Sequence, residues 1–337
     1  MGNNRGWLRW FGYIAGGLLA VVFLLAGIGF IYEQIEESRD RRLNHPPGLM
    51  VDVGGYRMHL YCIGQGSPTV VLDSGTGEYW LSWYKVQPEI AKVTRVCSFD
   101  RAGLGWSDPS PNPRTSRVMA QELHTLLHNA GVPAPFVLAG HSLGGANTRV
   151  YTSLYPADVL GIVLVDAVHP DINRRSPETV EYLKTFIRTL DRIGGAMPFG
   201  IPRIMGWCGT DPPEFRSMAQ TVECQSKHWR EVHEEWANFD VNMDQVRSTP
   251  SLGSMPLIVV SRDPEKLVEG MPANISKEIN QVWESLQQEL VGLSSNSSRM
   301  IAKDAEHYVQ IDRPDVVIEA VRKIVDQCRA AQAGSRP

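Results

Sequence analysis

Short runs of apolar residues recur along the chain and predict the strands of a buried sheet. Continuous apolar runs of this length are typical of parallel strands that are covered on both faces. The first two runs are joined by a Gly-Gly pair and predict an antiparallel pair of strands. The runs span residues 51–54, 56–63, 69–73, 95–99, 136–139, 162–165 and 257–260.

Helical patterns separate several of these strands, notably at 116–129 and 147–155. Strands that alternate with helices predict an α/β fold in which right-handed crossovers connect parallel strands. We predict that the core of this fold occupies residues 49–167 and 251–333.

The stretch between the two parts of the core has no strand pattern and predicts a helical insertion over residues 168–250. Its apolar residues recur at a spacing of three to four, which is the spacing of an amphipathic helix. Such an insertion is either a packed helical layer or a lid over an active site, and one segment can be both. The apolar positions are Phe215, Met218, Val222, Trp229, Val232, Trp236 and Phe239.

The N-terminal region predicts a membrane anchor. Residues 11–32 contain no charged side chain. A helix of this length spans about 33 Å, which is enough to cross a hydrocarbon layer of about 30 Å. The run is too long for the apolar core of a signal peptide, and it lacks the polar face of a soluble helix. We predict a short tail at 1–10, a transmembrane helix at 11–32 and a linker at 33–48.

Charges on either side of this helix favour a cytoplasmic N-terminus. Arg5 and Arg9 precede the apolar run with no acidic residue beside them, as the positive-inside rule requires. Arg39, Arg41 and Arg42 follow the run and weaken this bias. We predict a single-pass membrane protein whose larger part lies on the extracytoplasmic side.

The overall composition is that of a globular protein with a sizeable core. The 337 residues are 43% hydrophobic and 21% charged, and the formal net charge is −4. This balance lacks the basic footprint of a nucleic-acid-binding protein. We therefore expect no nucleic-acid partner.

The five cysteines form no C-x-x-C pair, so neither a zinc ribbon nor a thioredoxin-like motif is indicated. Cys62 and Cys97 lie in strand-like runs and Cys328 lies on an apolar helical face, so we interpret all three as buried hydrophobic residues. Cys208 and Cys224 are the best candidates for a disulfide, which would matter only in an oxidising compartment.

The motif Gly140-His141-Ser142-Leu143-Gly144 has the pattern G-x-S-x-G and stands between a predicted strand and a predicted helix. In that context the serine lies on a tight turn that needs glycine on both sides. The turn holds the serine side chain clear of the sheet, and the N–H groups at the start of the helix favour negative charge nearby. We predict that Ser142 is a nucleophile.

A nucleophilic serine needs a base, and the base needs an acid that orients it. His307 follows the last strand-like run and comes late enough in the chain for the order serine, acid, histidine. Asp263 follows the seventh predicted strand and is the predicted acid. Asp166 follows the sixth predicted strand and is the alternative acid, and Glu265 is a weaker third choice.

Two backbone N–H groups are predicted to stabilise the negative oxygen of a tetrahedral intermediate. Leu143 contributes one of them from the start of the helix that follows the serine. Thr76 contributes the other from the Ser74-Gly75-Thr76-Gly77 loop after the third strand. Each such donor typically contributes about 2.7–4 kcal/mol to catalysis.

These motifs resemble the α/β-hydrolase superfamily over roughly residues 50–330, and its lid-bearing, esterase-like members in particular. GHSLGG at 140–145 resembles the nucleophile elbow, DRAGLGWSD at 100–108 the loop after the fourth strand, and 305–317 the histidine loop. The resemblance implies an eight-stranded, mostly parallel sheet flanked by helices, with a lid inserted after the sixth strand. It also implies a reaction that needs no cofactor and no metal.

Two departures from the family pattern bear on the site. Ser74-Gly75 stands where the family has His-Gly, which changes the support of the oxyanion donor. The acid loop at 261–263 is one residue shorter than the common pattern. In addition, position 142 is Ser rather than Asp. This argues against epoxide hydrolases and haloalkane dehalogenases, which are relatives with a carboxylate nucleophile.

Together these features predict a membrane-anchored serine hydrolase, most simply a carboxylic ester hydrolase that acts through the predicted triad. Its partner is a small ester or acyl substrate, and the tryptophans of the insertion suggest an apolar one. A peptidase of the proline-iminopeptidase kind would instead bind a substrate amine with acids such as Glu231, Glu234 and Glu235. A cofactor-free haloperoxidase and a catalytically inactive, membrane-tethered binding protein are the remaining alternatives.

Overall fold

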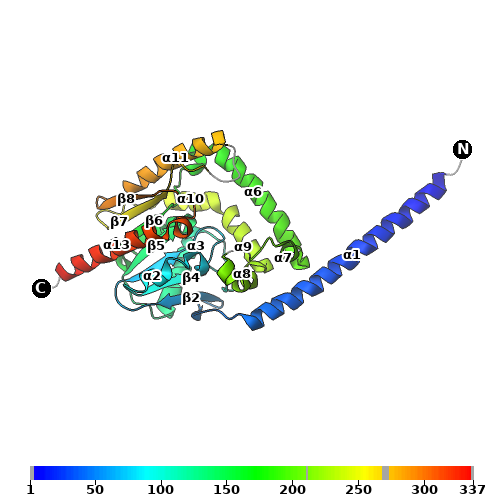
Figure 1. Ribbon diagram of the computed structural model, residues 1–337, viewed down its shortest axis with the longest axis horizontal. Coiled ribbons are helices and arrows are strands. Elements are labelled where there is room, and N and C mark those ends of the chain that lie inside the picture. Colours follow the sequence, from blue (N-terminus) through cyan, green and yellow to red (C-terminus); the bar gives the residue numbers. More distant parts are fainter. Residues whose placement is uncertain (1–3, 210–211, 268–272, 335–337) are drawn as a thin grey trace. The chain divides into compact units, whose positions relative to one another are not determined.

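One eight-stranded sheet forms the framework of the larger part of the computed structural model, which describes residues 4–209, 212–267 and 273–334 (Figure 1). The strand order is β1-β2-β4-β3-β5-β6-β7-β8, and only β2 runs against the other strands. The predicted α/β fold with an eight-stranded, mostly parallel sheet is confirmed. The strands are β1 (Leu49–Asp52), β2 (Arg57–Ile63), β3 (Thr69–Asp73), β4 (Val96–Phe99), β5 (Phe136–His141), β6 (Val159–Val165), β7 (Leu257–Arg262) and β8 (Ser297–Ala302).

Seven of these strands overlap the predicted apolar runs, and β8 does not. The sequence of β8 is Ser-Ser-Arg-Met-Ile-Ala, and most of its side chains are half-buried or exposed. It lies at the edge of the sheet beside β7. Because an edge strand is covered less completely than a central one, it needs no continuous apolar run, and its sequence gives little signal.

Apolar side chains fill both faces of the sheet in two clusters. In β5, Leu138 belongs to one cluster and its neighbours Val137 and Ala139 belong to the other. Alternate residues of a strand point to opposite faces, so a strand that is covered on both faces is apolar throughout. The predicted apolar runs therefore mark the centre of the sheet.

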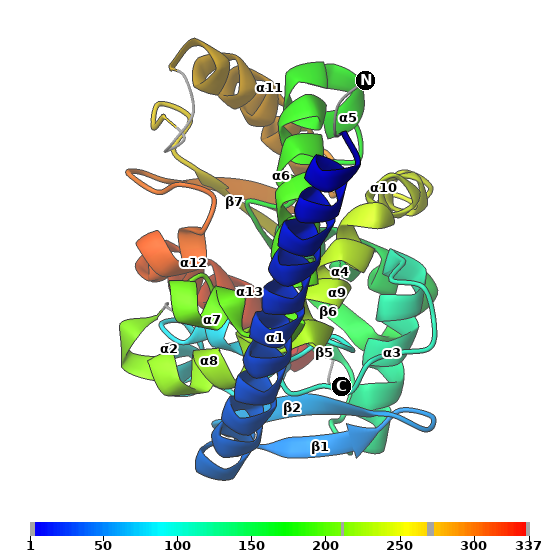
Figure 2. The same cartoon turned by 90° about the vertical axis from the view of Figure 1, so that its right-hand side faces the viewer.

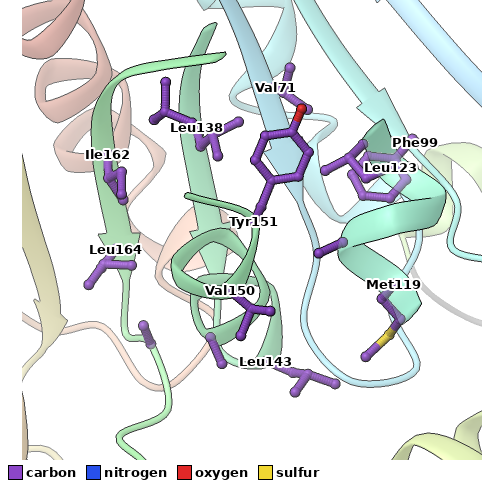
Figure 3. Close-up of a cluster of buried hydrophobic side chains, with 14 of the residues drawn as sticks. Val71, Phe99, Met119, Leu123, Leu138, Leu143, Val150, Tyr151, Ile162 and Leu164 are labelled. Carbon is purple, nitrogen blue, oxygen red and sulfur yellow. The ribbon is translucent and has the colours of Figure 1, made fainter. Parts of the chain in front are cut away.

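Helices cover both faces. Figure 3 shows the first cluster, in which Leu123 and Tyr151 from two helices are grouped with Leu138 and Ile162 from the strands. This cluster packs against α3 (Ser116–Asn129), α4 (Leu143–Leu154), α10 (Phe239–Arg247) and α11 (Ala273–Val291). The second cluster packs against η1 (Trp80–Trp83), α2 (Gln87–Ile90), α12 (Val309–Asp312) and α13 (Pro314–Gly334).

The chain divides into two compact units. The sheet unit comprises residues 46–188 and those from 230 onward, and the anchor unit comprises residues up to 45 together with 189–229. The predicted insertion at 168–250 is therefore shared between the two units. Its last helix, α10, belongs to the sheet unit.

The insertion consists of helices and turns over its described residues, which exclude positions 210 and 211. This agrees with the 3–4 spacing of apolar residues in the sequence. The elements are α5 (Ile172–Arg175), α6 (Pro177–Ala196), η3 (Met197–Phe199), α7 (Ile201–Met205), η4 (Pro213–Phe215), α8 (Arg216–Glu223), α9 (Ser226–Ala237) and α10.

Helix α1 spans Asn4–Leu43, so the helix continues through residues that we predicted as a linker. The segment at 33–43 contains neither Gly nor Pro and is rich in Glu and Arg, which are good helix formers. The helix ends shortly before Pro46-Pro47, where proline stops it. By length and composition α1 can cross a membrane, and its most apolar window has a mean hydropathy of 2.6. Residues 1–3 of the predicted tail lie outside the described residues.

Four of the five cysteines form disulfides. Cys208 pairs with Cys224, which were the best candidates from the sequence, and Cys328 is free and buried, in line with its place on an apolar helical face. The interpretation of Cys62 and Cys97 as unpaired residues is wrong, because they form a second disulfide. They lie opposite each other in the β2–β4 register with their Cα atoms 4.0 Å apart. The strand pattern indicated that each is buried, but the pairing depends on the register between strands, which the pattern does not show.

Candidate active site

Ser142 lies on the tight turn between β5 and α4, as the motif predicts. Its backbone has φ 50° and ψ −117°, which is a strained conformation for a residue other than glycine. A Cβ atom on Gly140 would lie 2.4 Å from the carbonyl oxygen of Gly144. A Cβ atom on Gly144 would lie 2.3 Å from the carbonyl oxygen of Asp73. The glycines are therefore required by close backbone contacts on both sides of the serine.

His307 lies in the loop between β8 and α12, and its ring joins two of the predicted residues. Its Nε2 lies 3.0 Å from Ser142 Oγ, and its Nδ1 lies 2.7 Å from Asp166 Oδ2. An imidazole that donates through Nδ1 has a free electron pair on Nε2, so it can accept the serine proton. The geometry brings the predicted nucleophile, the predicted base and a carboxylate into one line of hydrogen bonds.

Asp166 is the carboxylate in this line, and it directly follows β6. Its side chain is fully buried, and its Oδ1 accepts from the Trp283 indole N–H (2.8 Å) and from the backbone N–H of Arg262 (3.1 Å). Burial alone would raise the pKa of Asp166. The hydrogen bond from His307 and the charge of Arg262 outweigh burial and hold the pKa below its usual value. Asp166 is therefore charged at neutral pH.

The prediction that Asp263 is the acid beside His307 is wrong in geometry. Its Oδ1 accepts from the backbone N–H of Glu265, and its Oδ2 accepts from the backbone N–H of Asp304, each at 2.9 Å. β7 continues through Arg262, so Asp263 begins the loop beyond the sheet and its carboxylate meets loop backbone instead of the imidazole. Glu265, the third choice, has an exposed side chain.

A buried ion pair that the sequence analysis missed lies beside the histidine. His141 is fully buried, and its Nδ1 lies 2.9 Å from Glu78 Oε1. Its Nε2 lies 2.8 Å from the backbone carbonyl oxygen of His307, to which it can donate. Burial alone would lower the pKa of His141, but Glu78 outweighs it, and the pKa is raised. This pair holds the His307 loop and places a positive charge next to the imidazole.

That positive charge affects the base itself. Burial lowers the pKa of His307, the hydrogen bond to Asp166 opposes this, and the charge of His141 adds to the lowering. The net shift is downward. His307 is therefore neutral at pH 7, which is the state that a general base requires.

A second buried network holds the loop that carries Thr76. The guanidinium of Arg101 donates to Asp73 Oδ1 (2.8 Å) and to the carbonyl oxygens of Ser74 and Gly75 (both 2.6 Å). It also donates to Glu235 Oε1 at 2.6 Å. The other oxygen of Glu235 accepts from the backbone N–H of Gly77 at 2.8 Å.

The hydrogen bonds of Arg101 position the loop that carries one of the two predicted oxyanion donors. The Ser74 carbonyl oxygen would lie 2.6 Å from a Cβ atom on Gly144, so the loop lies against the start of α4. Leu143 begins that helix, while Thr76 belongs to the loop that Arg101 fixes. Arg101 belongs to the DRAGLGWSD motif, but its partner Glu235 lies 134 residues away in the sequence. No local pattern indicates such a contact.

The acids of α9 have partners within the sheet unit. Glu235 is paired with Arg101, and Glu231 is paired with Arg114, which also forms two hydrogen bonds to Glu122. Glu234 has an exposed side chain. Two of the three acids that a peptidase would use for a substrate amine are therefore already neutralised. Within the described residues no group of three His, Cys, Asp or Glu side chains could hold a metal ion.

Comparisons with known proteins relate the fold of this chain to that of hydrolases. A family model described as the alpha/beta hydrolase fold matches residues 68–211. A protein from Hormonema carpetanum named "Probable transporter efuK" is 24% identical over 86% of this chain and 44% of its own length. An uncharacterized protein from Schizosaccharomyces pombe is 24% identical over 92% of this chain and 62% of its own length. The chain thus spans less than two thirds of these relatives.

A third relative is an uncharacterized vacuolar membrane protein of Saccharomyces cerevisiae, which is 28% identical over 35% of this chain and 21% of its own length. Among solved structures, a thermophilic esterase from Thermogutta terrifontis has 22% identity and a TM-score of 0.60 over 83% of this chain and 97% of its own. A haloalkane dehalogenase variant from Bradyrhizobium elkanii has 16% identity and a TM-score of 0.65 over 86% and 99% of the two chains. At these identities the likeness shows the fold alone.

Proposed function

We propose that this chain, which has the α/β-hydrolase fold, is a membrane-anchored serine hydrolase that cleaves carboxylic esters. The observation that carries the proposal is the line of hydrogen bonds from Ser142 through His307 to Asp166. A carboxylate nucleophile, which the relatives with epoxide or haloalkane substrates use, is absent at position 142. This supports acyl transfer as the reaction.

In the proposed mechanism His307 removes the proton from Ser142 as the serine oxygen attacks the ester carbonyl. Asp166 holds the imidazole in the tautomer that is protonated on Nδ1 and stabilises the imidazolium that forms. The N–H groups of Leu143 and Thr76 are the proposed donors to the oxyanion of the tetrahedral intermediate. The imidazolium protonates the leaving alcohol, and water then releases the acyl group by the same steps.

We also propose that the hydrolase part lies on the extracytoplasmic side of the membrane. The apolar helix α1 supports the anchor, and the charges of Arg5 and Arg9 support a cytoplasmic N-terminus. Two disulfides, Cys62–Cys97 and Cys208–Cys224, support this orientation, because disulfides persist in oxidising compartments.

Among the alternatives, an ester substrate has the better support. The acids Glu231 and Glu235 are held by arginines, which leaves them unsuited to bind a substrate amine. This weighs against the peptidase. A catalytically inactive binding protein would have no need for the strained backbone at Ser142, which costs stability.

The test uses the full-length protein in detergent or bilayers, treated with a fluorophosphonate probe and with p-nitrophenyl esters of increasing chain length. We expect labelling and hydrolysis in the wild type and neither in Ser142→Ala, while the exposed-serine control Ser295→Ala behaves like the wild type. Hydrolysis retained by folded Ser142→Ala would refute the proposal. An unlabelled, inactive wild type would favour the binding-protein alternative.

A further inference from the structure

The anchor helix continues beyond its apolar segment and packs against part of the insertion. Within the anchor unit α1 contacts η3 and α8. Helices α7 and α8 lie beside α1 in Figure 1 and Figure 2. The residues of α1 that are shielded in this region recur every three or four positions, as one face of a helix does. They are Ala26, Gly29, Glu33, Glu36, Glu37 and Asp40, and the half-buried Asn44 directly follows the helix.

An ion-pair cluster fixes α7 to this face. Arg203 of α7 forms hydrogen bonds with both oxygens of Glu33, of which the shortest is 2.9 Å, and with Asp40 Oδ2 at 2.7 Å. Glu33 is 1% exposed. A shielded arginine held by two carboxylates is costly to separate, because separation would leave unpaired buried charges.

Close backbone contacts place η3 beside the end of the apolar segment. A Cβ atom on Gly29 would lie 2.5 Å from the carbonyl oxygen of Phe199. A Cβ atom on Gly200, which has φ 67°, would lie 2.8 Å from the ring of Tyr32. The chain around residue 200 is therefore level with the last turn of the predicted transmembrane helix.

The segment held at this level exposes a group of large apolar side chains, which we call the apolar patch. Their exposed fractions are high for residues of this type in a water-facing domain, and the disulfide Cys208–Cys224 fixes the end of the segment. The patch consists of Phe199 (37% exposed), Ile201 (44%), Ile204 (66%), Met205 (56%) and Trp207 (51%).

We propose that the apolar patch is inserted into the membrane surface beside α1, so that the insertion makes a second contact with the lipid bilayer. The patch adjoins a helix whose apolar side chains are themselves exposed and can only be covered by lipid if α1 spans the membrane. Apolar and tryptophan side chains next to such a helix are typical of the interfacial region of a bilayer. The proposal rests on the proposed membrane anchor and is independent of the catalytic reaction.

The test measures the depth of single fluorescent labels in full-length protein reconstituted into phosphatidylcholine vesicles. Ile204→Cys and Trp207→Cys carry the label in the patch, and Leu19→Cys carries it in the apolar segment of α1. Arg216→Cys is the matched control in the same unit. It begins α8, which packs near Asn44, just past the end of α1 and about 22 Å from Gly29 along the helix axis. The unmodified chain is the blank, since its free cysteine, Cys328, is buried.

We expect the labels at 204 and 207 to emit at shorter wavelength than the label at 216 and to be quenched several times more strongly by nitroxide lipids. Equal, weak quenching at 204, 207 and 216 would overturn the proposal. A blue-shifted label at 204 that lipid does not quench would also overturn it, because a protein partner would then cover the patch. A label at 19 that is not quenched would show that the membrane anchor itself has failed.

Discussion

Two neighbouring parallel strands, β6 and β7, are each followed directly by an aspartate, and only one of these faces the imidazole. Asp166 follows β6, is fully buried and contacts His307. Asp263 follows β7, is 8% exposed and binds the backbone of its own loop and of the adjoining loop. Both loops leave the same edge of the sheet, so the edge alone does not decide which carboxylate reaches the histidine.

The two carboxylates differ in the groups that donate hydrogen bonds to their oxygens. Asp166 has a positive φ of 39° and contacts His307 through one oxygen, and its other oxygen accepts from an indole and one backbone N–H. Each oxygen of Asp263 accepts from a loop backbone N–H group, and these bonds hold the carboxylate against loop backbone instead of His307. The comparison teaches that an acid of this kind is recognised by the groups that hold its carboxylate more than by its place after a strand.

The largest expected effect comes from exchanging each carboxylate for an amide. We expect Asp166→Asn to lower kcat for a p-nitrophenyl ester by about 10⁴-fold, because the amide favours the wrong imidazole tautomer. Asp263→Asn should stay within a few-fold of the wild type. Steady-state kinetics of both variants, with thermal unfolding as a check of the fold, decides the matter. Similar losses in the two variants would break the comparison.

A smaller effect is expected from the support of Asp166. Trp283→Phe removes one hydrogen bond to a charged group and should lower kcat by about ten-fold. Trp229→Phe is the matched control, because it also loses an indole hydrogen bond, but to the carbonyl oxygen of Glu223 in the anchor unit. Equal kcat values in the two variants would show that the indole does not support the acid.

The pH profile tests the electrostatics of the histidines. Burial and, after it, the charge of His141 lower the pKa of His307. Since the base must be neutral, the acid limb of kcat/KM should lie below about pH 6.5, the usual histidine value. In Glu78→Gln, His141 loses the carboxylate that raises its pKa and becomes neutral, so the pKa of His307 rises and the acid limb moves to higher pH. An unmoved or lower limb would contradict this, whereas Asp263→Asn should leave the limb in place.

The smallest effect concerns stability. The backbone N–H of Asp304 lowers the pKa of Asp263, so its carboxylate stabilises the fold at neutral pH. This contribution is present above the unfolded pKa of about 3.9 and is lost as the pH falls through the lower folded value. We expect Asp263→Asn to cost about 1 kcal/mol at pH 7. Thermal unfolding at pH 7 and below pH 4 should show a difference from the wild type that shrinks with acid.

The sequence predicted those parts of the molecule that depend on local pattern. Ser142 and the central strands follow from a motif and from apolar runs, and the position of His307 follows from chain order. Contacts between distant segments could not be predicted in this way. The Glu78–His141 pair and the choice of Asp166 depend on how loops meet at the edge of the sheet.

The same distinction explains the errors outside the site. β8 was missed because an edge strand carries mixed polarity, and the helix through residues 33–43 was missed because its charged residues resemble a linker. The Cys62–Cys97 disulfide needs the register of two strands, which no single run contains. The disulfide and the edge strand depend on how separate segments pack together, which the pattern within one segment does not show.

The Cys62–Cys97 bridge also makes the polypeptide between these cysteines a closed covalent ring, with 35 positions from one cysteine to the other. The closed loop contains β3, the loop at 73–77 and η1. The segment that carries Thr76 therefore has fewer conformations available when the chain is unfolded. By a chain-entropy argument, closing such a ring is worth about 4 kcal/mol. A molecule retained in a reducing cytosol would lack that contribution. The bridge therefore makes the stability of the sheet unit depend on the redox state of its surroundings, and the folded state is favoured where these are oxidising.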